Sequence, residues 1–296
     1  MQYYKQLIFC VSALFVNLCT VPVLLNHLSL HQKLKLKLIR PDVISVSMPL
    51  PEAVPDAQET FERLTDSFEK QYPEFGIELK LCEDLSDLPE NSDLYINYQP
   101  EMKTADLSEI FRELPEERYL ISLDGHSDAV PLSFSVPALY YDMADMNLFQ
   151  KFSGIKILNP EGLPEDTVTE TPDFQMFLEN PEHPVLFPVS GMRQAEQNPL
   201  SSGRIQMIPV LDQNQPEIIQ TNLCWLNSQS SKNKQNIAML WIEYLLSEEA
   251  QRILFAEHYG DLPVHKKAFD TAVNQHQGYY PLKEIRPILE DSDYES

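Results

Sequence analysis

The order of strand-like and helix-like segments after the N-terminal apolar stretch constrains the fold more than any other feature. Residues 43–48 (VISVSM) and 76–81 (GIELKL) alternate apolar and polar side chains, as β-strands do. Residues 57–72 place apolar side chains at steps of three and four, which predicts an amphipathic helix that Pro73 ends. Residues 94–98 (LYINY) predict a third strand. This order predicts an α/β sheet with parallel neighbouring strands.

The middle of the chain predicts short extended segments and little helix. Residues 129–141 (AVPLSFSVPALYY) contain two prolines, which predicts an edge strand or a segment that crosses between parts of the fold. Residues 152–171 are rich in proline, glycine and acidic residues and predict a loop. The other predicted elements are a short helix and an extended segment within 107–123, one or two helical turns at 174–178, and short strands at 185–189, 205–210 and 222–226.

The clearest helix is predicted near the C-terminus. Residues 236–257 carry a long apolar stripe, and Ser247 interrupts it with two glutamates that suit the start of a second helix. Residues 262–264 are predicted to be extended, and residues 283–289 to form a last short helix.

Composition excludes several classes of function. There are 45 acidic and 22 basic residues, which gives a net charge of −23 and disfavours a nucleic-acid partner. There are only 8 glycines and no glycine-rich phosphate loop, and the seven histidines lack ligand-like spacing. No GxSxG or HExxH motif is present. We therefore expect no catalytic residues, no metal site and no cofactor, and predict that the protein is not an enzyme.

Two cysteines, Cys82 and Cys224, lie beyond the N-terminal segment. Their wide separation, without CxxC spacing, disfavours a zinc site. One disulfide and two buried free thiols both remain open.

The N-terminus carries an apolar run from Leu7 to Leu25 after Lys5. Its length is close to the ~20 residues that span a bilayer as a helix. No cleavage site with small residues follows the run, which favours an uncleaved membrane anchor over a signal peptide. Lipidation at Cys19 is the alternative, although residues 16–18 (VNL) match the small residues expected before such a cysteine poorly.

Aromatic residues in the middle of the chain are candidates for sugar binding, because rings cover the apolar faces of sugars. The candidates are Phe134, Tyr140, Tyr141 and Trp225. The alternative is that these rings are core residues, since aromatic side chains bury a large area.

Three stretches resemble extracellular solute-binding proteins of bacterial ABC importers, of the carbohydrate-binding family 1. Residues 129–143 (AVPLSFSVPALYYDM) resemble the segment where the chain of that family crosses from its first lobe to its second. Residues 61–81 (FERLTDSFEKQYPEFGIELKL) resemble its first helix and second strand. Residues 235–269 resemble its late helical pair and the turn that follows, here GDLPVHKKAF. The three matches occur in the order of the family.

The resemblance implies a two-lobed α/β fold of the periplasmic-binding-protein type, with the ligand between the lobes. It implies an N-terminal membrane segment and linker at 1–40 and a first lobe from 41–130 with the C-terminal part of 227–296. The second lobe would comprise 131–226 with parts of 227–296. This lobe is reduced, because a proline-rich acidic loop stands where the family has several helices.

The resemblance also implies ligand-binding positions at the ends of strands and in the crossing segment. Carried over residue by residue, they are Glu52, Asn97, Tyr98, Ser133, Phe134, Tyr140, Gly191 and Trp225. Gly191 lies in a Ser-Gly-Met sequence that resembles the end of a cleft strand of the family without its tryptophan.

The resemblance implies a membrane-anchored solute-binding protein of an ABC importer. Such a protein would bind a carbohydrate, here expected to be an oligosaccharide, and would dock on the permease subunits. Lys33, Lys35, Lys37 and Arg40 follow the apolar run, and the positive-inside rule alone would keep the following domain in the cytoplasm. The resemblance instead implies an extracellular domain at the cell membrane. The alternative function is a degenerate interaction or sensory module without a small ligand.

Overall fold

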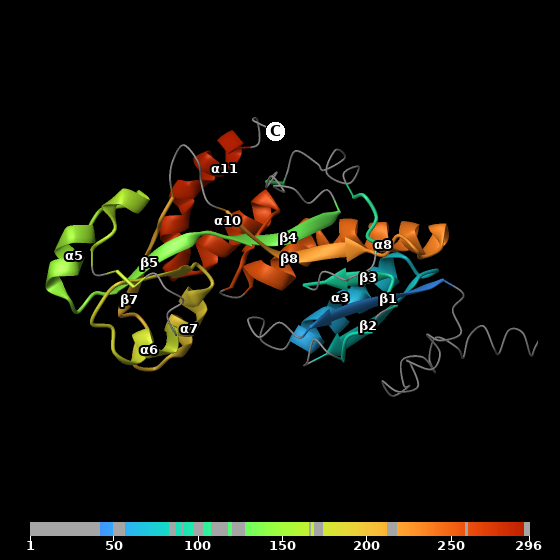
Figure 1. The fold of residues 1–296 in the computed structure, drawn as a ribbon, viewed down its shortest axis with the longest axis horizontal. Coiled ribbons are helices and arrows are strands. Elements are labelled where there is room, and N and C mark those ends of the chain that lie inside the picture. The colour runs from blue at the N-terminus through green and yellow to red at the C-terminus, as the bar shows by residue number, and fades with distance from the viewer. Residues whose placement is uncertain are drawn as a thin grey trace, which may run out of the picture.

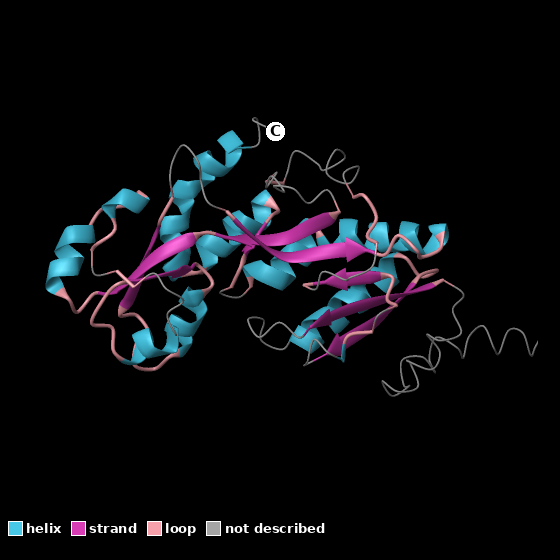
Figure 2. Ribbon diagram, viewed as in Figure 1, coloured by secondary structure: helices cyan, strands magenta, loops and turns pink. Residues whose placement is uncertain are grey.

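The computed structural model contains two β-sheets that are flanked by helices and joined by crossing segments (Figures 1 and 2). The structure describes residues 42–49, 57–82, 87–89, 91–97, 103–107, 118–119, 128–165, 167–168, 174–211, 218–257 and 260–292. We call the six-stranded sheet with its helices the first lobe, and the three-stranded sheet with its helices the second lobe.

The six-stranded sheet has the order β2-β1-β3-β8-β4-β9. Its strands are β1 (Val43–Pro49), β2 (Gly76–Cys82), β3 (Leu94–Ile96), β4 (Ala129–Ser135), β8 (Ile219–Leu226) and β9 (Leu262–Pro263). The predicted parallel pairing is confirmed for β1 with β2 and with β3. The rest of the sheet, for which no pairing was predicted, is antiparallel: β8 pairs with both β3 and β4, and β9 pairs with β4. The reason is topological: β4 leaves the first lobe and β8 returns to it.

One face of this sheet is apolar and packs on helices α3 (Ala57–Gln71) and α8 (Lys232–Leu245). Between the two helices, the rings of Phe68 and Trp241 pack edge to face, with their centroids 5.0 Å apart. Helix α8 continues through α9 (Glu248–Gln251) into the π-helical segment η3 (Arg252–Ala256), so the predicted interruption near Ser247 is confirmed. The Ser247 hydroxyl caps α9 by accepting from the Ala250 amide.

The opposite face of the six-stranded sheet is mixed in character. Tyr95 and Trp225 lie side by side in register on β3 and β8, and both are buried. Ser133 on β4 lies on the same face, because residues of a strand alternate between its two faces and Ala129 pairs with Trp225.

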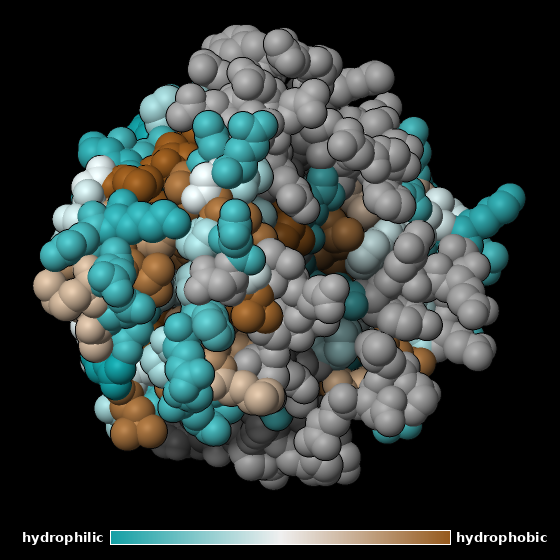
Figure 3. Space-filling view, turned by 60° about the vertical axis from the view of Figure 1, so that its left-hand side comes forward, coloured by the Kyte–Doolittle hydropathy of each residue, from teal (hydrophilic) through white to brown (hydrophobic). Residues whose placement is uncertain are grey.

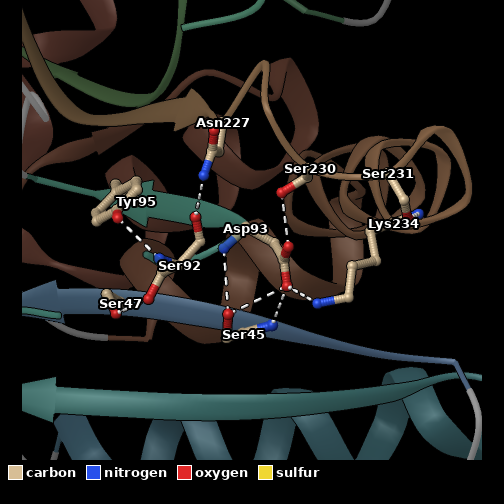
Figure 4. A network of polar contacts seen from close by, with 9 residues as sticks. All are labelled: Ser45, Ser47, Ser92, Asp93, Tyr95, Asn227, Ser230, Ser231 and Lys234. Atoms are coloured by element: carbon tan, nitrogen blue, oxygen red, sulfur yellow. Dashed lines mark hydrogen bonds and ion pairs between the residues drawn. The ribbon is translucent and has the colours of Figure 1, made fainter. Parts of the chain in front are cut away.

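A polar network stabilises the end of the first lobe where β3 begins (Figure 4). The buried Asp93 carboxylate accepts hydrogen bonds from the Ser45 amide at 2.9 Å and from the Ser230 hydroxyl at 2.6 Å, and pairs with Lys234 at 2.9 Å. This joins β1, β3 and the first turn of α8. Burial raises the pKa of Asp93, but the hydrogen bonds and Lys234 together bring it below its ordinary value.

The three-stranded sheet has the antiparallel order β6-β5-β7. Its strands are β5 (Pro137–Asp142), β6 (Val185–Pro188) and β7 (Ile205–Pro209). Strand β5 follows β4 after Val136 alone, so the crossing segment predicted from residues 129–141 is confirmed. Figure 1 shows β4 and β5 running from one lobe to the other as a nearly continuous ribbon.

The helices of the second lobe are short. They are α5 (Met146–Phe152), the 3-10 turn η2 (Pro160–Gly162), α6 (Phe174–Glu179) and α7 (Gly191–Gln197). The short α6 was predicted, and residues 152–171 are mainly loop where they are described, as expected. Helices α5, α7 and the first-lobe helix α10 (Lys266–Gln275) were not predicted, because short helices carry too few turns for a clear periodic signal.

The C-terminal segment joins the two lobes. It runs through the 3-10 segment η4 (Gln277–Ile285), which contacts β7, into α11 (Arg286–Ser292). The main hydrophobic core accordingly includes buried residues of both sheets together with Tyr279 and Leu282.

The predicted membrane segment at 1–40 lies outside the described residues. Within the described part, no helix has the length and apolar character needed to cross a membrane.

Candidate functional site

Five polar side chains meet where the end of β3 reaches the two strands that cross between the lobes. Asn97 follows β3, Ser133 lies on β4, and Thr221 and Asn222 lie on β8. Asp261 precedes β9 and completes the group. We call these five residues the junction cluster.

The hydrogen bonds of the junction cluster converge on one carboxylate. Asn97 Nδ2 donates to Asn222 Oδ1 at 2.7 Å, and Asn222 Nδ2 donates to Asp261 Oδ2 at 3.0 Å and to Ser133 Oγ at 2.6 Å. The Thr221 hydroxyl also hydrogen-bonds to Asp261. A hydroxyl has one proton, so the 2.8 Å contact between Ser133 and Thr221 is donated by Ser133. Two chains of donors therefore end at Asp261.

Two members of the junction cluster have left-handed backbones. Asn97 has φ of 60° and Asn222 has φ of 53°, and they are the only non-glycine residues of the described chain with positive φ. Asparagine tolerates this conformation better than most residues, but it still carries strain that surrounding contacts must hold. The amide pair between Asn97 and Asn222 provides such contacts. Strain of this kind is typical of functional sites.

The Asp261 carboxyl has an unusual environment for an aspartate. Burial raises its pKa to about 6, although the hydrogen bonds from Thr221 and Asn222 act in the opposite direction. No lysine, arginine or histidine in the described part of the chain forms an ion pair with it. The four other cluster residues are neutral, so within the cluster its charge is stabilised by dipoles and not by an opposite charge.

The C-terminal segment holds the loop that carries Asp261. The Tyr279 hydroxyl accepts from the Gly260 amide at 2.6 Å and donates to the Gly260 carbonyl at 2.5 Å. The neighbouring Gly278 packs closely against Met192 of α7, in the second lobe. The position of Asp261 is therefore linked to a segment that contacts the second lobe.

The structure brings together two of the predicted site residues, Asn97 and Ser133. Thr221 and Asp261 were not predicted. Residues 222–225 resemble a cleft segment of the family, but of these only Trp225 was predicted to bind ligand, and not Asn222. Asparagine is depleted in strands, so Asn222 within a strand-like run was a signal that could have been noticed. Asp261 carries no comparable local signal.

Phe134 and Tyr140 lie in the core, which is the alternative that the sequence left open. The Phe134 ring stacks on the Phe269 ring, with the two centroids 6.2 Å apart, and is fully buried. The Tyr140 hydroxyl donates to the carbonyls of Pro188 at 2.9 Å and Val189 at 3.0 Å, and the side chain is also fully buried. Neither ring is exposed in this conformation, so the expectation that they line a ligand site is corrected. The physical reason for Phe134 is that it follows Ser133 in a strand and so points to the other face.

Gly191 begins α7 and is buried for a packing reason. A Cβ atom there would lie 2.7 Å from the Phe187 ring and 3.1 Å from the Phe174 ring. Trp225 is 6% exposed and packs with Tyr95, and its indole nitrogen has no hydrogen-bond partner among the described residues. Glu52 and Tyr98 lie outside the described residues, so their predicted roles stay predictions.

The two cysteines are free thiols in the structure. Cys224 is fully buried, and burial raises the pKa of its thiol far above the ordinary value. The described residues contain no group of three or more histidine, cysteine or acidic side chains that could hold a metal ion.

Solved structures with this arrangement of lobes are mainly ABC-type solute-binding proteins. The chain resembles the maltodextrin-binding protein MalE1 of L. casei BL23, solved without ligand, with a TM-score of 0.57 and 10% identity over 82% of this chain and 85% of that one. It also resembles an ABC substrate-binding protein of Listeria monocytogenes in complex with cycloalternan, with a TM-score of 0.53 and 12% identity over 84% and 87% of the two chains. The chain has the solute-binding-protein fold.

This solute-binding-protein fold is also used by an enzyme. Thiaminase I from Bacillus thiaminolyticus has a TM-score of 0.51 to this chain, with 13% identity over 85% of this chain and 92% of the enzyme. The fold alone therefore does not separate a binding protein from an enzyme. No protein-family model and no curated protein sequence matches the chain.

Proposed function

We propose that the protein is a solute-binding protein that holds a carbohydrate at the junction between its lobes, and that this carbohydrate is an oligosaccharide. The observation that carries the proposal is the junction cluster. Its amides, hydroxyls and carboxylate are the groups that pair with sugar hydroxyls, and four of its five residues are partly exposed. They lie beside the strands that connect the lobes, where a hinge motion would close the site around a ligand.

The proposal includes attachment to the cell membrane by residues 1–40, with the binding domain outside the cell, and delivery to the permease subunits of an ABC importer. The apolar run from Leu7 to Leu25 supports the attachment. Exposed apolar side chains support a protein partner. Six of the eight large hydrophobic residues that the described surface exposes belong to the second lobe, and Met176 and Leu200 are each 68% exposed. Figure 3, which brings the second lobe forward, shows such hydrophobic areas among hydrophilic ones.

We propose binding without catalysis. In the junction cluster the carboxylate accepts hydrogen bonds from the Asn222 amide and the Thr221 hydroxyl, and no second carboxylate accompanies it among the described residues. The competing proposal is a module without a small ligand. The burial of Phe134 and Tyr140 supports it, because these rings are not available to stack on a sugar.

The test is thermal melting of the full chain in detergent micelles against a panel of neutral oligosaccharides. A ligand that binds only the folded state raises the melting temperature in a concentration-dependent way. Asn97→Ala, which removes a donor of the junction cluster, should abolish the shift, whereas Asn233→Ala, at an exposed asparagine of α8, should not. If well-folded protein shows no shift with any sugar, the module without a small ligand replaces this proposal.

A further inference from the structure

Asp261 differs from the two most deeply buried aspartates of the described chain. Asp93 and Asp142 are each 5% exposed, and each has a basic partner: Lys234 for Asp93 and Arg204 for Asp142. Asp261 is partly buried and has none among the described residues. Buried charges in proteins are normally paired, because a lone charge loses its hydration without compensation.

The hydrogen bonds of the junction cluster suit an ionised Asp261 but do not neutralise it. Asn222 and Thr221 both direct protons toward the carboxylate. Thr221 accepts from Ser133, Ser133 accepts from Asn222, and Asn222 accepts from Asn97. Burial nevertheless raises the pKa of Asp261 above its ordinary value, so these neutral donors compensate only part of the lost hydration. A positively charged group beside Asp261 would compensate the rest of the hydration that its carboxylate loses on burial.

A second polar group, the hydroxyl of Ser135, lies two residues after Ser133 on β4. Strands β4 and β9 pair Ser133 with Pro263 and Phe134 with Leu262, and one more step of this register places Ser135 opposite Asp261. Ser135 is 1% exposed, and its hydroxyl has no partner among the described residues. A buried hydroxyl without a partner is costly. Because Ser135 is buried like Phe134 and Tyr140, a ligand group would reach its hydroxyl and Asp261 together only after the lobes move.

We propose that Asp261 is the counter-ion for a positively charged group of the ligand, so that the junction cluster takes a hydroxylated ligand that carries an ammonium group, as an amino sugar does. The inference rests on the proposed function, because it assumes that a ligand binds at the junction. The amides and hydroxyls of the cluster bind the neutral hydroxyls, and Asp261 selects the charge. An anionic ligand is disfavoured by the same carboxylate and by the net charge of −23.

The experiment compares two ligands that differ in one group. Oligomers of glucosamine and oligomers of glucose with the same linkage and length are titrated into the full chain in detergent micelles by calorimetry. We expect the amino oligomer to bind roughly tenfold more tightly, which is the effect of one additional charged hydrogen bond. Asp261→Asn should remove this preference and retain binding of the neutral oligomer. Asp270→Asn, which removes an exposed carboxylate near the C-terminus, should retain the preference.

A second measurement uses the unmodified chain alone, so its result does not depend on whether the Asp261→Asn variant folds. Binding of the amino oligomer to the unmodified chain should strengthen as the pH rises from about 4 to about 6, because Asp261 becomes ionised while most amino groups of the oligomer still carry their proton. Binding of the neutral oligomer should not follow this trend. Equal binding of the two oligomers, or a preference that survives in Asp261→Asn, would overturn the inference and leave the proposed function standing. No binding of either oligomer to folded protein would overturn both.

Discussion

The Tyr279 hydroxyl holds Gly260 by both of its backbone groups, at 2.6 Å from the amide nitrogen and 2.5 Å from the carbonyl oxygen. Tyr279 is fully buried and belongs to the segment that contacts the second lobe. One side chain thus fixes the residue that precedes Asp261, and the C-terminal segment helps to position the junction cluster.

Replacing this tyrosine should weaken the fold measurably. Tyr279→Phe removes both hydrogen bonds to Gly260 and should lower the free energy of unfolding by about 1 to 3 kcal/mol, since a lost partner leaves polar groups unpaired. Urea unfolding followed by circular dichroism measures the change. Tyr280→Phe is the matched control, because Tyr280 is 51% exposed and should tolerate the loss of its hydroxyl. Equal stability of the two variants would contradict the role of Tyr279.

Asp261 should make the unmodified protein less stable as the pH rises. Burial raises its pKa from 3.8 to about 6, so the folded state binds more protons than the unfolded state between these values. Below about pH 4 the free energy of unfolding of Asp261→Asn should equal that of the unmodified protein. Above about pH 6 it should be higher by about 1 to 2 kcal/mol, after allowance for the partial exposure of the carboxyl. Unfolding free energies across this pH range test the prediction, and a gap that closes with rising pH would refute it.

Asp93 should show the opposite pH dependence. Its pKa is lowered in the folded state, so its contribution to stability is present above the ordinary carboxyl pKa and is lost as the pH falls through the lowered value. Asp93→Asn should cost about 2 to 3 kcal/mol at neutral pH, because Lys234, Ser230 and Ser45 lose their charged acceptor. The difference should shrink in strong acid. The same unfolding series provides the measurement, and a loss that stays constant with pH would argue against the ion pair.

Gly191 should resist enlargement for steric reasons. The methyl group of Gly191→Ala would press on the rings of Phe187 and Phe174, which stack at 4.6 Å, and should cost about 1 to 3 kcal/mol. Gly260→Ala is the control, since a Cβ atom there would meet nothing within 4 Å. Differential scanning calorimetry of both variants measures their melting temperatures, and only that of Gly191→Ala should fall. An unchanged melting temperature for Gly191→Ala would mean that the rings move aside easily.

Much of the first lobe could be predicted because its elements have clear local periodicity. Strands β1 and β2 alternate along their length, and helices α3 and α8 carry apolar stripes. The order of elements also predicted the parallel pairing of β1, β2 and β3. No local pattern specified that β8 returns antiparallel between β3 and β4, because that pairing depends on where the chain re-enters the sheet after the second lobe.

The candidate site was predicted only in part for the same reason. Asn97 and Ser133 were selected by resemblance, whereas Asn222 and Asp261 join them through the pairing of β8 and β9 with β4. Ser133 and Phe134 were both expected at the site, although neighbours in a strand face opposite ways. The sequence shows this alternation but not which face points to the junction.

The second lobe is a single insertion between β4 and β8, and this has a consequence for how the chain is made. The first sheet is not complete until β8 and β9 have been synthesised, near the end of the chain, whereas every strand of the second sheet is already present by Pro209. During synthesis the second sheet can therefore pair its strands while the first still lacks its middle strand. Because the insertion leaves the first sheet after β4 and returns at β8, a change in its length would leave the strand order of the first sheet unaltered.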